Sequence, residues 1–236
     1  MKKIYYSILT GVLCVFISLT SKSQVTVAGS TGANGTYPSL TLAGGAFAAI
    51  NAAGTQAGNN ITVSITADLL TETGANPLNA SDWTTLTISP SGGAIRNVQG
   101  NVNGPLIDLN GADNVTIDGL NTGGNALNID NQNGVSASTI RFINDASNNT
   151  LIRCNILGAS GITAGPALGT IYFAGGTTTG NDNNAISQCI LSASVTGTPQ
   201  NAIYSLGTSA AVDNSNNTIF ACLINDFLIP QILLPV

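Results

Sequence analysis

The chain has 236 residues, of which 43% are hydrophobic and only 7% are charged, and it contains no histidine. Lack of histidine removes the most common general base and metal ligand. After residue 23 the chain keeps three basic residues (Arg96, Arg141 and Arg153) and all 11 acidic ones, a net charge of −8, so it offers no basic surface for nucleic acid or an anionic membrane.

Residues 1–23 are predicted to be a secretory signal peptide. Lys2 and Lys3 form a basic start, an apolar run extends from Ile4 to Leu19, and small residues precede Gln24, where cleavage is expected. The apolar run is shorter than the roughly 20 residues that a membrane span needs, so a cleaved signal is favoured over an anchor. We therefore expect a secreted protein, either extracellular or at the cell surface, without a membrane contact after cleavage.

Residues 24–58 are predicted to cap one end of the fold. Val25-Thr26-Val27 reads as a short strand, and a turn-rich loop follows from Gly29 to Pro38. Residues 43–53 carry the only helical pattern after the signal, with Phe47 and Ile50 on one face. Solenoids need such a cap because an open end exposes apolar core and unpaired backbone.

Residues 59–227 are predicted to form the coils of the solenoid, and the first coils occupy 59–103. The runs Ile61–Thr66 and Trp83–Ser89 alternate between apolar and polar residues, which is typical of strands. Between them, Asp68–Ser81 reads as a longer loop that carries Glu72, the only glutamate.

A nine-residue pattern repeats within 104–227. Asn148 to Ile156 reads N-N-T-L-I-R-C-N-I, and similar copies begin at Asn183 and Asn216, with a weaker copy at Asp113. The second residues of the copies are separated by 35, 35 and 33 positions, from 114 through 149 and 184 to 217. A fixed period of this size indicates a solenoid.

The repeat positions predict which side chains point inward. Three columns are mostly apolar or small, and their spacing requires a strand, a bend and a second strand. Further strand-like runs lie between the copies, at 106–109, 140–143, 171–174 and 203–206. The inward columns are Thr116, Leu151, Ile186 and Ile219; Gly119, Cys154, Cys189 and Cys222; and Asn121, Ile156, Leu191 and Ile224. With no helical period, a parallel β-helix is predicted.

Stacked coils place like residues over like residues. The asparagine column is therefore expected to form side-chain amide ladders at the turns. The cysteine column suits buried thiols, and free thiols are favoured over disulfides because parallel Cβ vectors fit a disulfide poorly.

The signal, the helix-capped start and the N-N-T-I-x-x-C coils resemble right-handed parallel β-helix repeat proteins of the pectin-lyase-like superfamily. More closely, they resemble the N-terminal part of large secreted bacterial surface repeat proteins. The resemblance covers about 24–227 and implies a right-handed, all-β solenoid. Residues 228–236 abandon the pattern and form an irregular apolar tail. We read this tail as a truncation, and we expect end-to-end self-association.

The resemblance implies how an enzyme of this superfamily would work, because its polysaccharide lyases share the use of aspartates to bind Ca²⁺ and of Arg or Lys as base. Such an enzyme would need charged groups gathered on one outer face. The ion-pair interpretation, Asp118 with Arg153 and Asp108 with Arg141, is favoured over catalysis. Asp113 is more typical of a turn residue than of a Ca²⁺ ligand with Asp118. Tyr172 and Tyr204 share a column that could stack on sugar or simply cover the sheet. The remaining charged candidates are Asp130 and Asp145.

The sequence favours a secreted structural or adhesin-like scaffold that contacts polysaccharide or cell-surface glycans. The alternative is a polysaccharide lyase or glycoside hydrolase. No catalytic, cofactor-binding or metal-ligating residue is assigned, and no cofactor is expected. Ice binding through flat threonine rows ranks low because Thr177-Thr178-Thr179 has no partner in the next coil.

Overall fold

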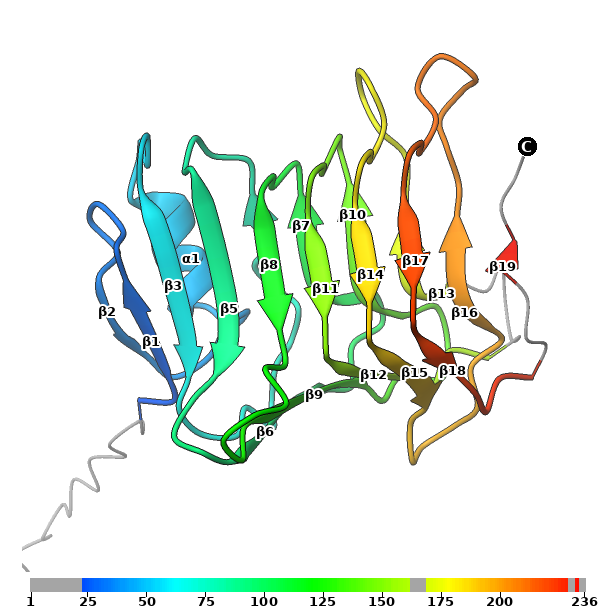
Figure 1. Ribbon diagram of the computed structural model, residues 1–236, viewed down its shortest axis with the longest axis horizontal. Helices are drawn as coiled ribbons and strands as arrows, with labels where there is room; N and C mark the ends of the chain where they lie inside the picture. The colour runs from blue at the N-terminus through cyan, green and yellow to red at the C-terminus, as the bar shows by residue number, and fades with distance from the viewer. Residues whose placement is uncertain (1–22, 162–168, 229–231, 234–236) are drawn as a thin grey trace, which may run out of the picture.

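The computed structural model describes residues 23–161 and 169–228 and the backbone of 232–233. The strands lie in three sheets, here called A, B and C (Figure 1). In spatial order, sheet A contains β2 (Gly35–Tyr37), β1 (Val25–Ala28), β3 (Asn60–Ile65), β5 (Thr85–Pro90), β8 (Val115–Asp118), β11 (Thr150–Ile152), β14 (Ala185–Ser187) and β17 (Thr218–Phe220). Sheet B contains β6 (Ile95–Gly100), β9 (Ala126–Asn131), β12 (Asn155–Gly158), β15 (Ile190–Ala193) and β18 (Leu223–Ile224). Sheet C contains β4 (Leu78–Asn79), β7 (Pro105–Asn110), β10 (Ser138–Ile143), β13 (Gly169–Phe173), β16 (Asn201–Ser205) and β19 (Ile232–Leu233).

The chain passes through sheets A, B and C in turn and then returns to A, so each regular coil has three strands. Neighbouring coils pair in parallel, which confirms the predicted parallel β-solenoid. The predicted bend inside the nine-residue pattern is also confirmed, because Arg153 and Cys154 separate β11 from β12. The expected right hand stays a prediction.

The predicted register is wrong in the first copy. Ile117, not Thr116, pairs with Leu151 and is buried, while Thr116 faces outward beside Thr150. In the third column Ile129, not Asn121, pairs with Ile156. The turn between β8 and β9 is longer than its later equivalents, and Leu120 and Asn121 both have positive φ in it. This expanded turn displaces the third column, whereas the first column is shifted because Asn114 corresponds to Asn148 and not to Asn149.

The N-terminal end carries different structure from the coils. The helix α1 (Ala46–Ala52) lies within the predicted 43–53 and buries Ala46, Phe47 and Ile50. Its Asn51 side chain donates to the Pro77 carbonyl at 2.8 Å and accepts from the Asn79 N–H at 3.0 Å. Asn51 thereby bonds backbone groups of the first strand of sheet C. These contacts suit the capping role expected for 24–58.

Strand β1 joins sheet A differently from the later strands. It pairs antiparallel with β3 on one side and with β2 on the other. The segment Gly29–Pro38, predicted to be a loop, therefore contains the strand β2. An antiparallel hairpin at this edge separates the parallel strands of sheet A from solvent.

Glu72 is buried, with 3% of its surface exposed, in the long loop before β4. Its Oε1 accepts from the Leu40 N–H at 3.0 Å, and its Oε2 accepts from the Thr41 N–H at 2.6 Å and from the Thr41 hydroxyl. The carboxylate thus satisfies the donors of a segment just before α1 and ties the cap to the first coil.

The predicted asparagine ladder is present. Asn149 Oδ1 accepts from the Val115 N–H at 2.8 Å, Asn184 Oδ1 from the Asn149 N–H at 2.9 Å, and Asn217 Oδ1 from the Asn184 N–H at 2.9 Å. Each Nδ2 also donates to a carbonyl of the preceding coil, at Ala112, Ala146 and Asn181. Asn149 and Asn184 are fully buried, so their amides satisfy backbone N–H and carbonyl groups that water cannot reach.

The cysteine column holds three free thiols, Cys154, Cys189 and Cys222. Cys154 and Cys189 are each 1% exposed, as predicted, but Cys222 is only half-buried because it lies in the last coil of the described structure. Contact with the Cys189 thiol, together with burial, raises the pKa of Cys154 well above its usual range. Thiolate formation at Cys154 is therefore disfavoured.

A thiol reagent should label native protein at Cys222 alone and reach Cys154 and Cys189 only after denaturation. Mass spectrometry of the mature chain cleaved before Asp182 and Asp213, which separates the three cysteines, would measure this, and rapid native labelling of Cys189 would contradict the inward column. Cys189→Ser is expected to lower the free energy of unfolding by about 1–3 kcal/mol because it buries a hydroxyl with poor partners.

The predicted signal peptide lies outside the described residues except for Ser23, and most of the tail 228–236 also lies outside them.

Candidate functional site

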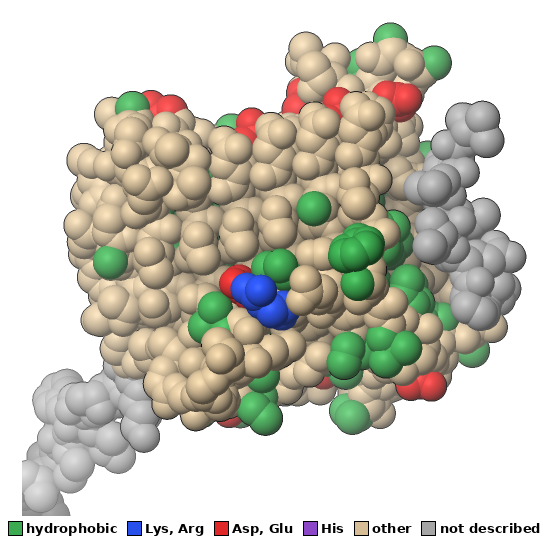
Figure 2. Space-filling model, viewed as in Figure 1, with side chains coloured by type: hydrophobic (Ala, Val, Ile, Leu, Met, Phe, Trp, Pro, Cys, Tyr) green, Lys and Arg blue, Asp and Glu red, His purple; other side chains and the backbone are tan. Residues whose placement is uncertain are grey.

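The outer face of sheet A carries uncharged polar side chains in register. One row contains Thr62, Thr87, Thr116, Thr150, Ala185 and Thr218. A second row, two residues earlier in the chain at each coil, is exposed and contains Asn60, Thr85, Asn114, Asn148, Asn183 and Asn216. The last four of these have φ between 54° and 60°, a conformation that asparagine adopts more readily than most residues. Figure 2 shows this face almost free of charged side chains.

The threonine row was not found from the sequence, where only Thr177–Thr179 was considered. In the structure those three residues form a loop whose N–H groups surround Asp145. The threonine row on sheet A lies beside an asparagine row, and Thr85-x-Thr87 is its one Thr-x-Thr pair within the described strands. The requirement set for ice binding is therefore not met.

Both predicted ion pairs are present. Arg153 forms two hydrogen bonds to Asp118, at 3.0 and 2.5 Å, next to sheet A. Arg141 forms two hydrogen bonds to Asp108, at 2.9 and 2.7 Å, on adjacent strands of sheet C. The aspartate side chains are 10–13% exposed and the arginines 27–34%, so the charges face each other near the surface. Donation of hydrogen bonds to the Asp108 carboxylate raises the pKa of Arg141 above its ordinary value.

Tyr172 and Tyr204 follow Arg141 in the same row of sheet C. Their rings are stacked, with centroids 5.7 Å apart and planes 29° from parallel. Tyr172 is only 9% exposed, so the pair does not form an open aromatic platform. Burial raises the pKa of Tyr172 above its ordinary value, which disfavours its phenolate as a base.

Asp113 and Asp145 are used in turns, whereas Asp130 lies on β9 and its Oδ2 accepts from the Gln132 amide at 3.1 Å. Asp113 Oδ1 accepts from the Ser147 N–H at 2.7 Å, as its turn interpretation predicted. Asp145 is surrounded by donors from 177–180. Partial burial opposes ionisation of Asp145, but hydrogen bonds from Thr177, Gly180 and Thr178 outweigh it and hold its pKa well below the usual range.

Asp113 behaves in the opposite way, because burial raises its pKa. A raised carboxylate pKa means that the charged form destabilises the fold at neutral pH, and the cost disappears as pH falls through the folded-state pKa.

Asp113→Asn keeps an acceptor for Ser147 and removes the charge. We expect this variant to be slightly more stable than wild type at pH 7 and no more stable at pH 3, measured by urea unfolding. Equal effects at the two pH values would contradict the assignment.

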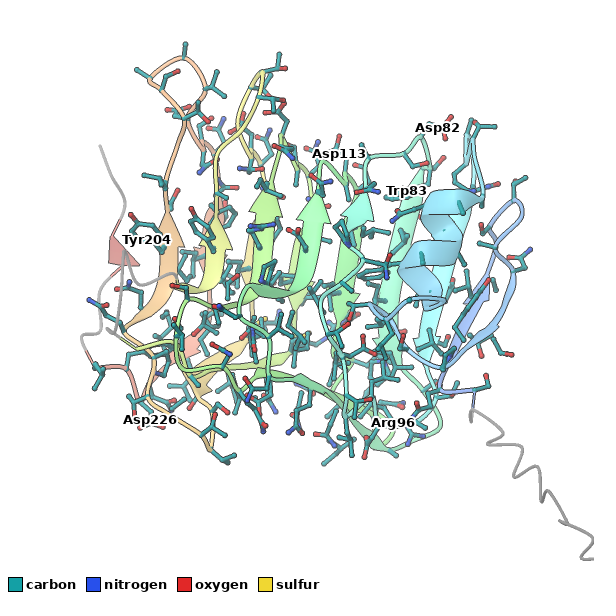
Figure 3. All side chains as sticks on the ribbon, turned by 180° about the vertical axis from the view of Figure 1, so that it is seen from behind. Asp82, Trp83, Arg96, Asp113, Tyr204 and Asp226 are labelled. Carbon is teal, nitrogen blue, oxygen red and sulfur yellow. The ribbon has the colours of Figure 1, made fainter. Side chains whose placement is uncertain are left out.

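The charged groups do not converge. Figure 3 shows Asp82 and Asp113 along one edge of the molecule and Arg96 and Asp226 along the opposite edge. In 23–161 and 169–228 no three histidine, cysteine or acidic side chains are grouped to hold a metal ion.

The outer face of sheet B carries a second amide ladder that the sequence analysis missed. Asn97, Asn128 and Asn155 are paired on β6, β9 and β12. Asn128 Nδ2 donates to Asn97 Oδ1 at 2.9 Å, and Asn155 Nδ2 donates to Asn128 Oδ1 at 2.8 Å. Asparagine is disfavoured in strands, so its recurrence in strand-like runs was the available signal. The unequal spacing, 31 and then 27 residues, concealed it.

A cleft of about 350 Å³ lies at the end of this ladder. Its lining residues come from three neighbouring strands of sheet B and are Asn128, Asn155, Leu157, Ile190 and Ser192. The cleft combines amide and hydroxyl groups with aliphatic side chains, which is the usual mixture in sites for small neutral ligands.

Comparison with known proteins finds no family model that matches the chain, no similar curated protein and no similar solved structure. Within the described part of the chain, no helix has the length and apolar character needed to cross a bilayer.

Proposed function

We propose that the chain is a secreted, non-catalytic scaffold of the adhesin type that contacts glycans through its outer faces. The observation that carries the proposal is how the charged side chains are used. Both arginines of the regular coils are held by aspartates in bidentate pairs, and Asp113 and Asp145 bond backbone donors in turns. Such groups are already bonded within the solenoid and are poorly placed to exchange protons with a substrate.

The faces of the solenoid support the contact with glycans. Sheet A presents rows of asparagine and threonine, and sheet B presents a ladder of asparagine. Amide and hydroxyl groups both donate and accept hydrogen bonds, as sugar hydroxyls require. The signal-like 1–23 supports export, and a place among bacterial surface repeat proteins of the pectin-lyase-like type is part of the same proposal.

A glycan array probed with the mature chain, residues 24–236, tests this function. We expect binding to a subset of glycans without cleavage. Failure to bind any glycan would overturn the proposal of a glycan-contacting scaffold.

The second candidate is a polysaccharide-cleaving enzyme, and one observation favours it. Asp108, Arg141, Tyr172 and Tyr204 form one outward row across four strands of sheet C, so acidic, basic and phenolic groups are adjacent. On the scaffold proposal, Arg141→Ala and Arg153→Ala leave glycan binding unchanged. Cleavage of pectate or alginate is measured as new unsaturated or reducing ends. If the protein cleaves either polymer and Arg141→Ala abolishes the cleavage, the enzyme proposal is correct and the scaffold proposal is wrong.

A further inference from the structure

We propose that the cleft on the outer face of sheet B, lined by Asn128, Asn155, Leu157, Ile190 and Ser192, binds one ring of a neutral hexopyranose. The inference rests on the proposed glycan-contacting function, and it names the site and the class of sugar.

The amide ladder is directional, and its direction leaves an acceptor at the cleft. Each Nδ2 donates toward the N-terminal neighbour: Asn97 to Asp68 Oδ1 at 3.2 Å, Asn128 to Asn97 and Asn155 to Asn128. Asn155 Oδ1 therefore lies on the side of β15, where the paired residue is Ile190 and no fourth amide continues the ladder. The ladder fixes the orientation of both lining amides, so the Asn155 oxygen is already positioned to accept a hydrogen bond from a sugar hydroxyl.

Aliphatic groups adjoin the open acceptor. Ile190 is 40% exposed and continues the asparagine row, while Leu157 lies in the next row and is partly exposed. A pyranose has an apolar C–H face and a hydroxylated edge. The C–H face can cover Ile190 and Leu157 while an edge hydroxyl reaches Asn155, and a cleft of about 350 Å³ falls in the range of small-molecule sites.

The charges around the cleft select a neutral sugar. All five lining side chains are uncharged, and the charged residues beside them are negative: Asp130 on β9 pairs with Leu157, and Ser192 Oγ donates to Asp226 Oδ2 at 3.2 Å. The two paired arginines belong to sheet C and to the turn after β11, and their charge is already met by aspartates. A uronic acid would find no cationic partner among the lining residues and would be repelled by Asp226.

The test is isothermal titration of the mature chain with cellotetraose, mannotetraose and tetragalacturonate, combined with saturation-transfer NMR. We expect at least one of the neutral tetrasaccharides to bind and tetragalacturonate not to bind. Asn155→Ala and the cleft-filling Ser192→Phe should each weaken binding at least tenfold. Gln99→Ala is the matched control, because it removes an amide from β6 on the same outer face without lining the cleft or bonding the ladder, and it should leave affinity unchanged. Thermal melts confirm that each variant folds.

Each outcome decides a different point. If a neutral tetrasaccharide binds and none of the variants changes its affinity, the cleft is not the site, while the proposed glycan-contacting function stands. If tetragalacturonate binds and the neutral sugars do not, the neutral class is wrong. If neither these sugars nor the glycan array gives binding, the proposed function fails together with the cleft.

Discussion

Asn184→Ala is expected to lower the free energy of unfolding by about 2–5 kcal/mol. The amide of Asn184 accepts from the Asn149 N–H and donates to the Ala146 carbonyl, and both partners belong to the preceding coil. Asn184 is 1% exposed, so no water replaces the lost amide. Leaving a buried donor or acceptor without a partner costs about 1–3 kcal/mol for each group.

Asn183→Gly provides the control for this prediction. Asn183 adjoins Asn184 in sequence, but it is exposed and has a φ of 57°, which glycine adopts without strain. Urea unfolding followed by circular dichroism should show little change for Asn183→Gly. Similar losses for the two variants would mean that the turn conformation, and not the amide ladder, stabilises the coil.

Glu72→Ala is expected to destabilise the N-terminal end by about 3 kcal/mol or more. The substitution removes the acceptors of the Leu40 and Thr41 N–H groups and of the Thr41 hydroxyl, all in a buried segment. Hydrogen bonds to a charged acceptor contribute more than neutral ones, about 1.5–3 kcal/mol each. Hydrogen exchange should show early loss of protection at Leu40, Thr41 and the neighbouring α1.

Glu72→Gln separates the hydrogen bonds from the charge. Glutamine keeps one oxygen that can accept from Thr41 but places an NH₂ group toward the other donor, so an intermediate loss of stability is expected. An unchanged exchange pattern in Glu72→Ala would show that the cap is held by the burial of Phe47 and Ile50 alone.

The parts of the fold that repeat were predictable from the sequence. Asn149, Asn184 and Asn217 recur at nearly constant spacing because the same turn must close in each coil, and the cysteines recur because the same inward position must be filled. Each constraint selects the same residue type at one position of every coil, so it is visible in the sequence as a repeat.

The features that were missed depend on contacts that do not recur from coil to coil. The expanded turn at Leu120 and Asn121 moved the third column of the first copy from Asn121 to Ile129. Glu72 bonds a segment 31–32 residues earlier that belongs to no repeat. The cleft on sheet B depends on Ile190 following Asn155 in register, where an asparagine would have extended the ladder. Whether a ladder continues or stops at a given strand is decided by pairing, and the pairing is known only from the structure.

The asparagine amides also make each coil depend on the coil that follows it. Asn149, Asn184 and Asn217 each bond an N–H and a carbonyl that lie one coil nearer the N-terminus. When only its own residues have folded, such a coil has a turn N–H and a turn carbonyl without partners. The asparagine of the following coil supplies both partners. Because synthesis proceeds from the N-terminus, we expect each coil to gain the last hydrogen bonds of its turn only after the next coil has been made and has folded onto it.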